Sequence, residues 1–488
     1  MPTGFKGILD SEKLWKGTSH TGPDLKAALS ARALRGVTTF VRPTYWASSS
    51  TNGKQLRRTA YLDGLRGFAA FMVYWLHHQL WAHEDLQMNR AFENAFGWDG
   101  HYYFVALPGV RTFFSGGHFA VTVFYVISGY VLSAKPLALI QAGEYVKLSD
   151  SVGSSLFRRW LRLFLPVIGT TFVFMSLLHI FNLPTSVLDK APTYSEEVSK
   201  WYKEFNDFAF IFRSGGEPWF TYHFHAWSIP VEFRGSIMIY ASIIAFSRCT
   251  RDARLLCQLG LIIYFVWITD GWFCGLFSSG MLLCDLDLLA ANDNLPRFLS
   301  KLRPYKQTIF HTLFIASIYL GGVPSSNADV NNLRDSYGWQ YLSYLKPKAM
   351  WDYKWFYLTW ASTFLVSSVP HISWLKAFFE THFCQYLGRI SFAFYLVHGP
   401  VLWLVADRLY ASVGWTKEWH GSNIPGWINK FPLPKGGPLG LEPSFLAIHL
   451  IVLPLTLWLA EVLTKVFDDP SIRISQWLYN KTLAGSEK

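Results

Sequence analysis

Residues 61–78 read Tyr-Leu-Asp-Gly-Leu-Arg-Gly-Phe-Ala-Ala-Phe-Met-Val-Tyr-Trp-Leu-His-His, and they begin a series of apolar segments that continues almost to the end of the chain. A bilayer core about 30 Å thick requires roughly 20 mainly apolar residues per helical span. Segments of this kind occur at residues 64–82, 117–134, 163–182, 229–247, 254–270, 272–290, 308–322, 354–370, 386–407 and 444–466. The sequence therefore predicts an all-α fold, a polytopic membrane helix bundle of about ten transmembrane helices.

The composition agrees with a membrane protein. Of the 488 residues, 51% are hydrophobic, 18% are aromatic and only 16% are charged, whereas soluble domains carry about 25% charged residues. The net charge of +11 would also suit a nucleic-acid-binding protein. However, the basic residues lie in loops beside apolar segments, which is where orientation signals are found. We therefore expect the lipid bilayer as a partner and no nucleic acid.

The loop charges predict the topology and the limits of the domains. With ten spans both termini lie on one side, and that side carries about twice as many Lys and Arg residues as the other, which predicts cytoplasmic termini. Residues 1–58 form a basic, partly disordered tail without the apolar core of a signal peptide. Residues 59–470 form the membrane domain, and residues 471–488 form a second cytoplasmic tail. The loops 183–228 and 408–443 are long enough to cover a site on the opposite face. The pattern does not distinguish an endomembrane from the plasma membrane.

Two ionisable residues of the first segment share one helix face. Arg66 and His77 are eleven residues apart, which in an α-helix gives about 20° beyond three full turns and a rise of about 16 Å. Taken singly, Arg66 suits an interfacial anchor and His77 suits a hydrogen-bonded packing residue. Together they form one stripe from the membrane edge towards its middle, where ionisable groups usually face a polar cavity. The pair therefore indicates a functional site.

Three further groups could carry chemistry. Arg158, Arg159 and Arg162 precede the third apolar segment. They suit a positive-inside signal, but arginines four apart on one helix face can also clamp phosphates. Glu232 lies just inside the fourth segment, where a carboxylate needs a partner or a function, and His398 lies within the ninth.

No metal site is predicted. The five cysteines show neither metal-ligand spacing nor a disulfide framework, and they suit small buried residues. His223 and His225 are two residues apart, a spacing that could bind a metal from a loop, but no third ligand is evident in the sequence.

The order of these motifs resembles a known family. The chain is similar to the acyltransferase-3 family of multi-span membrane acyltransferases over about residues 60–470, and most of all to its fungal members. The resemblance rests on five blocks in the family's order, at residues 61–77, 126–129, 158–162, 227–232 and 388–398. The chain departs from the pattern at Thr122, where many members have an aspartate, and at Tyr125, where many have a phenylalanine.

The resemblance implies an O-acyltransferase, and its chemistry suits these residues. The family uses acyl-CoA, commonly acetyl-CoA, as a co-substrate without a permanently bound cofactor. It acylates a hydroxyl of a small metabolite, including fungal secondary metabolites, or of a glycan or lipid. Of the residues that match the motifs, His77 would be a general base or accept the acyl group itself, with Glu232 or His398 orienting it or the acceptor. The phosphates of the donor would be bound by Arg66, Arg158, Arg159 and Arg162.

A proton-coupled membrane transporter is the alternative. Membrane-embedded His and Glu residues suit such a carrier. The chain lacks the internal repeat found in many transporters, which favours the acyltransferase.

Overall fold

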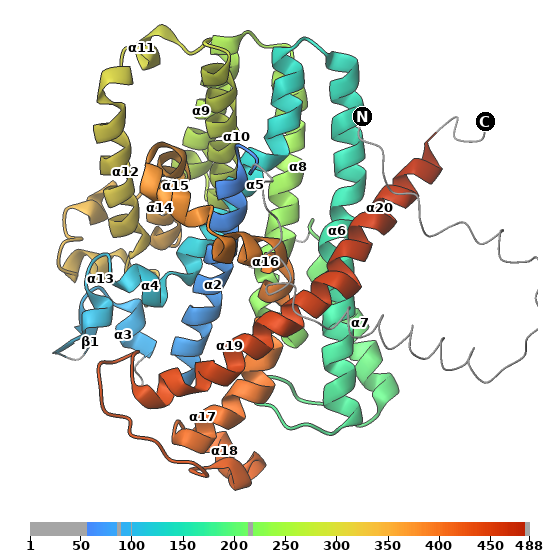
Figure 1. Ribbon diagram of the computed structural model, residues 1–488, viewed down its shortest axis with the longest axis vertical. Coiled ribbons are helices and arrows are strands. Elements are labelled where there is room, and N and C mark those ends of the chain that lie inside the picture. The colour runs from blue at the N-terminus through green and yellow to red at the C-terminus, as the bar shows by residue number, and fades with distance from the viewer. Residues whose placement is uncertain (1–55, 85–88, 99, 213–217, 484–488) are drawn as a thin grey trace, which may run out of the picture. The chain divides into compact units, whose positions relative to one another are not determined.

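The computed structural model describes residues 56–84, 89–98, 100–212 and 218–483, all of which belong to one compact unit. Within it, long helices form a bundle, shown in Figure 1. The predicted N-terminal tail, residues 1–58, falls almost entirely outside the described residues.

Among the described residues, ten helices of the bundle each coincide with one of the ten predicted apolar segments. They are α2 (Ala60–Ala82), α5 (Gly117–Gln141), α6 (Tyr145–Ile180), α8 (Ser228–Phe246), α9 (Arg251–Ile263), α10 (Trp272–Ala291), α12 (Lys306–Gly321), α14 (Tyr353–Ser368), α16 (His382–Val401) and α19 (Pro443–Leu463). Three of them continue into a π-helical turn: η4 (Tyr264–Ile268) after α9, η8 (Leu402–Ala406) after α16 and η10 (Thr464–Asp468) after α19.

The other elements lie between and after these helices. The α-helical ones are α3 (Asn89–Glu93), α4 (Arg111–Ser115), α7 (Tyr194–Ala209), α11 (Arg297–Ser300), α13 (Val330–Asp335), α15 (Ser373–Phe379), α17 (Asp407–Val413), α18 (Glu418–Asn423) and α20 (Asp469–Thr482). The 3-10 turns are η2 (Phe104–Ala106), η3 (Thr221–Trp227), η5 (Arg303–Tyr305), η6 (Leu342–Leu345), η7 (Val369–His371) and η9 (Pro425–Trp427). A two-residue antiparallel ladder joins β1 (Gly97–Trp98) to β2 (His101–Tyr102).

Six of the described helical segments are long and apolar enough to cross a membrane. They are Gly117–Gln141, Tyr145–Ile180, Thr221–Phe246, Trp272–Ala291, His382–Val413 and Pro443–Thr482. The four other helices of this set, α2, α9, α12 and α14, do not meet this measure of length and composition. The helix α2 carries several polar residues, α9 begins with Arg251, Asp252 and Arg254, and α12 and α14 have 16 residues each. The described residues thus form a helical bundle with six segments that could cross a membrane, and the total of ten spans stays a prediction.

The helices extend beyond the predicted limits at two places. The arginine block 158–162 lies inside the 36-residue helix α6 and not in a loop before it. Much of the predicted C-terminal tail forms α20, which continues α19 through a π-helical turn and packs against α6 (Figure 1). Because α20 continues from α19 without a break, its polar side chains can lie beside the arginine block of α6.

Small residues let the central helices approach closely. A Cβ atom at Gly129 of α5 would lie 2.1 Å from the carbonyl oxygen of Phe277, and one at Gly280 of α10 would lie 2.0 Å from that of Val126. A Cβ at Gly67 of α2 would lie 2.2 Å from the backbone nitrogen of Gly388 in α16. Backbone-to-backbone contact of this kind is how small residues join membrane helices.

The contact between α2 and α16 also sets the register of the site. His77 follows Gly67 by ten residues, His398 follows Gly388 by ten residues, and the two histidines are in contact, as described below. The two helices therefore run in the same direction. This is the orientation that ten spans would give to the first and the ninth.

We expect Gly67→Val to weaken this packing. The new side chain meets backbone atoms that cannot rotate away, so overpacking should cost about 1–3 kcal/mol or more. The midpoint of thermal aggregation of the detergent-solubilised protein should fall. Gly153→Val is the matched control, because nothing lies within 4 Å of a Cβ atom at that position of α6. Equal midpoints for the two variants would contradict the role of Gly67.

Candidate active site

Three histidines from distant parts of the chain meet inside the bundle. His77 lies on α2, His225 on η3 and His398 on α16. The ring centroid of His77 lies 3.7 Å from that of His225 and 5.0 Å from that of His398, with interplanar angles of 6° in both cases. His225 and His398 are buried, and His77 is partly exposed to a cavity. The three rings thus form a parallel group, which we name the histidine stack.

The hydrogen bonds of the histidine stack assign its proton positions. Nδ1 of His398 lies 2.6 Å from the carbonyl oxygen of Tyr395, and this oxygen can only accept. A neutral His398 therefore carries its proton on Nδ1 and presents the lone pair of Nε2. That Nε2 lies 2.9 Å from Nδ1 of His77, which must then donate. Nε2 of a neutral His77 is consequently left as its basic nitrogen.

The ring planes do not converge on a metal position. One nitrogen from each ring lies within 4.8 Å of the others, a spacing that could hold an ion. A metal, however, lies near the plane of each imidazole that binds it, and nearly parallel planes share no such point. The imidazoles beside His225 belong to His77 of α2 and His398 of α16. Both are far from His223 and His225 in the sequence, so spacing along the chain could not reveal them.

A cavity of about 330 Å³, which we name the histidine cavity, opens beside this stack. It lies along the C-terminal half of α2, because its wall includes α2 residues from Val73 to Trp81, followed by Glu84 just after the helix. His77, His118 and His225 are its imidazole groups. The rest of the wall is mainly apolar and is formed by Val73, Leu76, Leu80, Trp81, Val121, Phe224, Trp227, Tyr395 and Leu402, with Gly117.

A second cavity of about 550 Å³, which we name the arginine cavity, lies along the first turns of α2. Its charged wall consists of Arg57, Arg66, Arg159, Arg162 and Arg389 together with Asp63, Glu232, Asp468 and Asp469. Several serines and Gln385 also line it. Arginines from α2, α6 and α16 thus converge on one space, although they are far apart in the sequence.

Most of these arginines have a protein partner. Arg66 donates to the carbonyl oxygen of Gly388 at 2.9 Å and lies 3.5 Å from Asp63. Arg159 donates to Glu232, and both side chains are largely buried. A buried pair of this kind satisfies the carboxylate that the sequence placed just inside a span. Among the described residues, Arg162 has no hydrogen-bond or ion-pair partner, and it faces the arginine cavity.

Arg158 points elsewhere. Its guanidinium donates to Oε1 of Gln476 on α20 at 2.6 Å and to the carbonyl oxygen of Ser154 at 3.0 Å. It is not among the residues that line the arginine cavity. Of these two arginines, Arg162 lines the arginine cavity and Arg158 does not.

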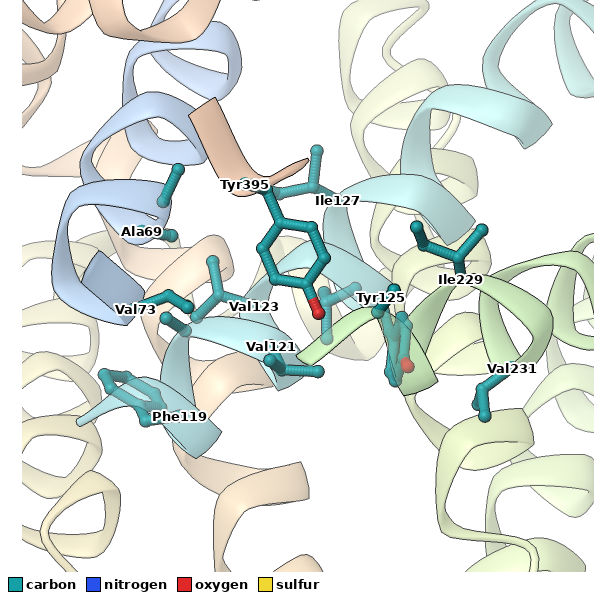
Figure 2. Packing of buried hydrophobic residues seen from close by; sticks show 14 of the residues in the cluster. Ala69, Val73, Phe119, Val121, Val123, Tyr125, Ile127, Ile229, Val231 and Tyr395 are labelled. Atoms are coloured by element: carbon teal, nitrogen blue, oxygen red, sulfur yellow. The ribbon is translucent and has the colours of Figure 1, made fainter. Parts of the chain in front are cut away.

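Tyr395 stands between the two cavities. It lines both of them, as does Val121. Its hydroxyl donates to the carbonyl oxygen of His225 and accepts from Oγ of Ser228 at 2.8 Å, which fixes the phenol ring. In the view of Figure 2 the hydroxyl of Tyr395 is directed towards the part of α5 that carries Val121. The spacing of polar residues gave no signal for this position.

The segment after η8 lies against the end of α2 beside the histidine cavity. Trp81 Nε1 donates to Asp407 Oδ1 at 2.7 Å, and His420 Nε2 lies 3.1 Å from the same oxygen. Lys417 lies 3.5 Å from the ring centroid of Trp81 and pairs with Glu84. Part of the predicted loop 408–443 thus packs at the edge of this cavity.

The predicted site residues therefore divide between two places. His77 lies in the histidine cavity with His398 behind it, whereas Arg66, Arg159, Arg162 and Glu232 line the arginine cavity. Reasoning from the sequence missed Tyr395 and the part that His225 plays in the stack. It considered His225 only as a metal ligand.

Known proteins are similar to this chain over most of its length. The family model Acyl_transf_3, described as an acyltransferase domain, matches residues 59–460. The O-acetyltransferase PaAT-1 of Phomopsis amygdali is 30% identical over 491 residues, covering 92% of this chain and 90% of that protein. The acyltransferase clz18 of Cochliobolus lunatus is 20% identical over 420 residues, covering 76% of this chain and 87% of that protein. No solved structure matches. The match to the family model and the similarity to PaAT-1 show that this chain belongs to the acyltransferase-3 family.

Proposed function

We propose that this acyltransferase moves an acyl group, most simply acetyl, from acyl-CoA to a hydroxyl of an acceptor, with His77 as the reacting base. The histidine stack carries the proposal, because its hydrogen bonds leave Nε2 of His77 basic beside a cavity that shares Tyr395 and Val121 with the arginine cavity. The relative named as an O-acetyltransferase supports acetyl as the group transferred.

The arginine cavity suits the donor. Coenzyme A carries several phosphate charges, and arginine binds phosphate through a planar fork of donors. Among the described residues the guanidinium of Arg162 makes no hydrogen bond or ion pair, its charge interacts with that of Asp468, and Arg66 lies in the same wall. The cavity is at the end of α2 that the loop charges predict to be cytoplasmic, the compartment that contains acyl-CoA. The thioester arm would then extend past Tyr395 towards His77.

The reaction needs one base and one leaving group. Nε2 of His77 takes the proton of the acceptor hydroxyl while the oxygen forms a bond to the thioester carbonyl carbon. The carbon–sulfur bond then breaks, and the thiolate takes the proton back from His77. Nδ1 of His77 keeps its hydrogen bond to His398 throughout, so the ring stays oriented. The products are the acyl ester and free coenzyme A.

In a second version of the mechanism His77 itself carries the acyl group. Nε2 attacks the thioester carbonyl carbon, and the carbon–sulfur bond breaks to release the thiolate of coenzyme A. The acceptor hydroxyl then attacks the acyl-imidazolium, its proton passes to the thiolate, and His77 is regenerated. Exchange of label between free coenzyme A and acetyl-CoA in the absence of acceptor distinguishes the two versions. Exchange on the timescale of turnover indicates the acyl-enzyme, and no exchange indicates general-base catalysis.

His398 is expected to act as a positioning residue. His398→Ala removes the acceptor that orients His77, and a reacting group that loses its orientation can cost about 100-fold in rate. We expect kcat to fall while the KM values for donor and acceptor stay within about twofold of wild type. His398→Gln presents an amide oxygen to Nδ1 of His77 and should restore part of kcat. A fall of kcat without rescue by Gln, or a rise in both KM values, would show a merely structural role.

Purified protein tests the proposed activity. In detergent, an acyltransferase should release coenzyme A from acetyl-CoA slowly in water and faster with an alcohol acceptor, as followed with a thiol reagent. A proton-coupled transporter would release none. Complete absence of thiol release from a monodisperse preparation, with acceptors supplied, would contradict the proposal.

A further inference from the structure

The wall of the histidine cavity indicates what kind of acceptor it can hold. At about 330 Å³ the cavity has the volume of about eleven liquid water molecules at ~30 Å³ each. Its imidazoles are those of His77, His118 and His225. The side chains of Trp81, Phe224 and Trp227 provide flat aromatic surface. Sites of this composition bind an apolar body and orient it through a few polar contacts.

Charge is almost absent from this wall. Glu84 is the one acidic side chain among the lining residues, and no lysine or arginine is among them. Its carboxylate is paired with Lys417, which also lies over the ring of Trp81. The arginine cavity, by contrast, has nine charged side chains in its wall. The two cavities therefore suit two chemically different ligands.

The polar groups left in the cavity for an acceptor are the imidazoles of His77, His118 and His225 and the carboxylate of Glu84, so they occupy few positions in an otherwise apolar wall. The phenol of Tyr395 is already committed to His225 and Ser228, and Nδ1 of His77 to His398. Each sugar hydroxyl that is buried without a partner costs about 1–3 kcal/mol. A molecule with one hydroxyl near His77 and an apolar ring body avoids this cost, because its rings can pack on Trp81, Phe224 and Trp227.

We infer that the histidine cavity is the acceptor site and that the acceptor is an apolar, ring-bearing alcohol and not a sugar. This inference rests on the proposed function for the transfer itself. The class of acceptor is inferred from the residues that line the cavity. The transfer reaction and the acceptor class can therefore be tested separately.

The first experiment compares two sets of acceptors with the purified full-length protein. Menthol and perillyl alcohol represent apolar ring-bearing alcohols, and methyl glucoside and N-acetylglucosamine represent sugars. Transfer from radiolabelled acetyl-CoA should give a kcat/KM at least tenfold higher for the first set. Equal or higher values for the sugars would overturn the inference.

A second readout does not depend on catalysis. Diethyl pyrocarbonate modifies neutral imidazoles, and the extent of modification at His77 can be followed by peptide mass spectrometry. Menthol and perillyl alcohol should slow this modification at least threefold at concentrations where the sugars have no effect. Protection without any transfer would preserve the acceptor class and reject the proposed function. Absence of protection by the apolar alcohols, together with absence of transfer to them, would overturn the inference.

A crossed pair of variants assigns each cavity to its ligand. Leu80 lines only the histidine cavity, and Leu163 lines only the arginine cavity. Leu80→Gln should raise the KM for menthol about tenfold and leave the KM for acetyl-CoA within twofold. Leu163→Gln introduces the same polar group and should leave the KM for menthol within twofold. A rise in the menthol KM that is as large in Leu163→Gln as in Leu80→Gln would contradict the assignment.

Discussion

His77→Ala is expected to reduce acyl transfer by about 10²–10⁴-fold, the range typical of losing a general base, while the protein still inserts and accumulates. The expected loss of activity follows from the role of one ring nitrogen of His77. His398 fixes Nδ1 of His77 as a donor, so Nε2 is the group available to take the hydroxyl proton. The measurement is the rate of acetyl ester formation per amount of monodisperse protein, with donor and acceptor both at saturation.

The matched control for this variant is His311→Ala. His311 is exposed on α12, bonds the carbonyl oxygen of Gln307, and lines neither the histidine cavity nor the arginine cavity. It should keep the wild-type rate. His77→Gln keeps a polar side chain of similar size, yet lacks a basic nitrogen, and should be as inactive as His77→Ala. Near-normal ester formation by either His77 variant would reject His77 as the reacting group.

The apolar pattern was sufficient to find the ten helices that coincide with apolar segments, because each segment follows from local composition and length, but it left α7 and α20 in a predicted loop and tail. The rotation of 100° per residue also placed Arg66 and His77 on one face of α2. Both residues line cavities in the structure. The division of the stripe between two cavities could not be predicted. It depends on Tyr395 of α16, which lies hundreds of residues away in the sequence.

The histidine stack was hidden for the same reason. His225 and His398 approach His77 only because Gly67 and Gly388 allow α2 and α16 to touch, and because η3 leads His225 inwards. Helix periodicity describes one helix at a time and carries no information about such contacts. Helix periodicity also suggested that Arg158 and Arg162 could bind one ligand together. It could not foresee that Gln476 of α20 bonds the guanidinium of Arg158.

This difference between two neighbouring arginines leads to the second large expected effect. Arg162→Gln should raise the KM for acetyl-CoA by about 10- to 100-fold, which corresponds to the loss of a hydrogen bond to a charged group worth about 1.5–3 kcal/mol. Arg158→Gln makes the same change one helical turn away, where the guanidinium is held by Gln476 and Ser154. We expect its KM for acetyl-CoA to stay within about twofold of wild type.

A truncated donor separates phosphate binding from a change of shape. Acetyl-pantetheine has the thioester but lacks the nucleotide and its phosphates, so its turnover should be the same in wild type and in Arg162→Gln. If Arg162 only supports the local packing of α6, the variant should lose activity with both donors alike. If the positive-inside signal is its whole role, the KM for acetyl-CoA should not change at all. Only direct contact with the phosphates predicts a loss with acetyl-CoA that disappears with acetyl-pantetheine, since the charge on Arg162 then has no partner on the donor.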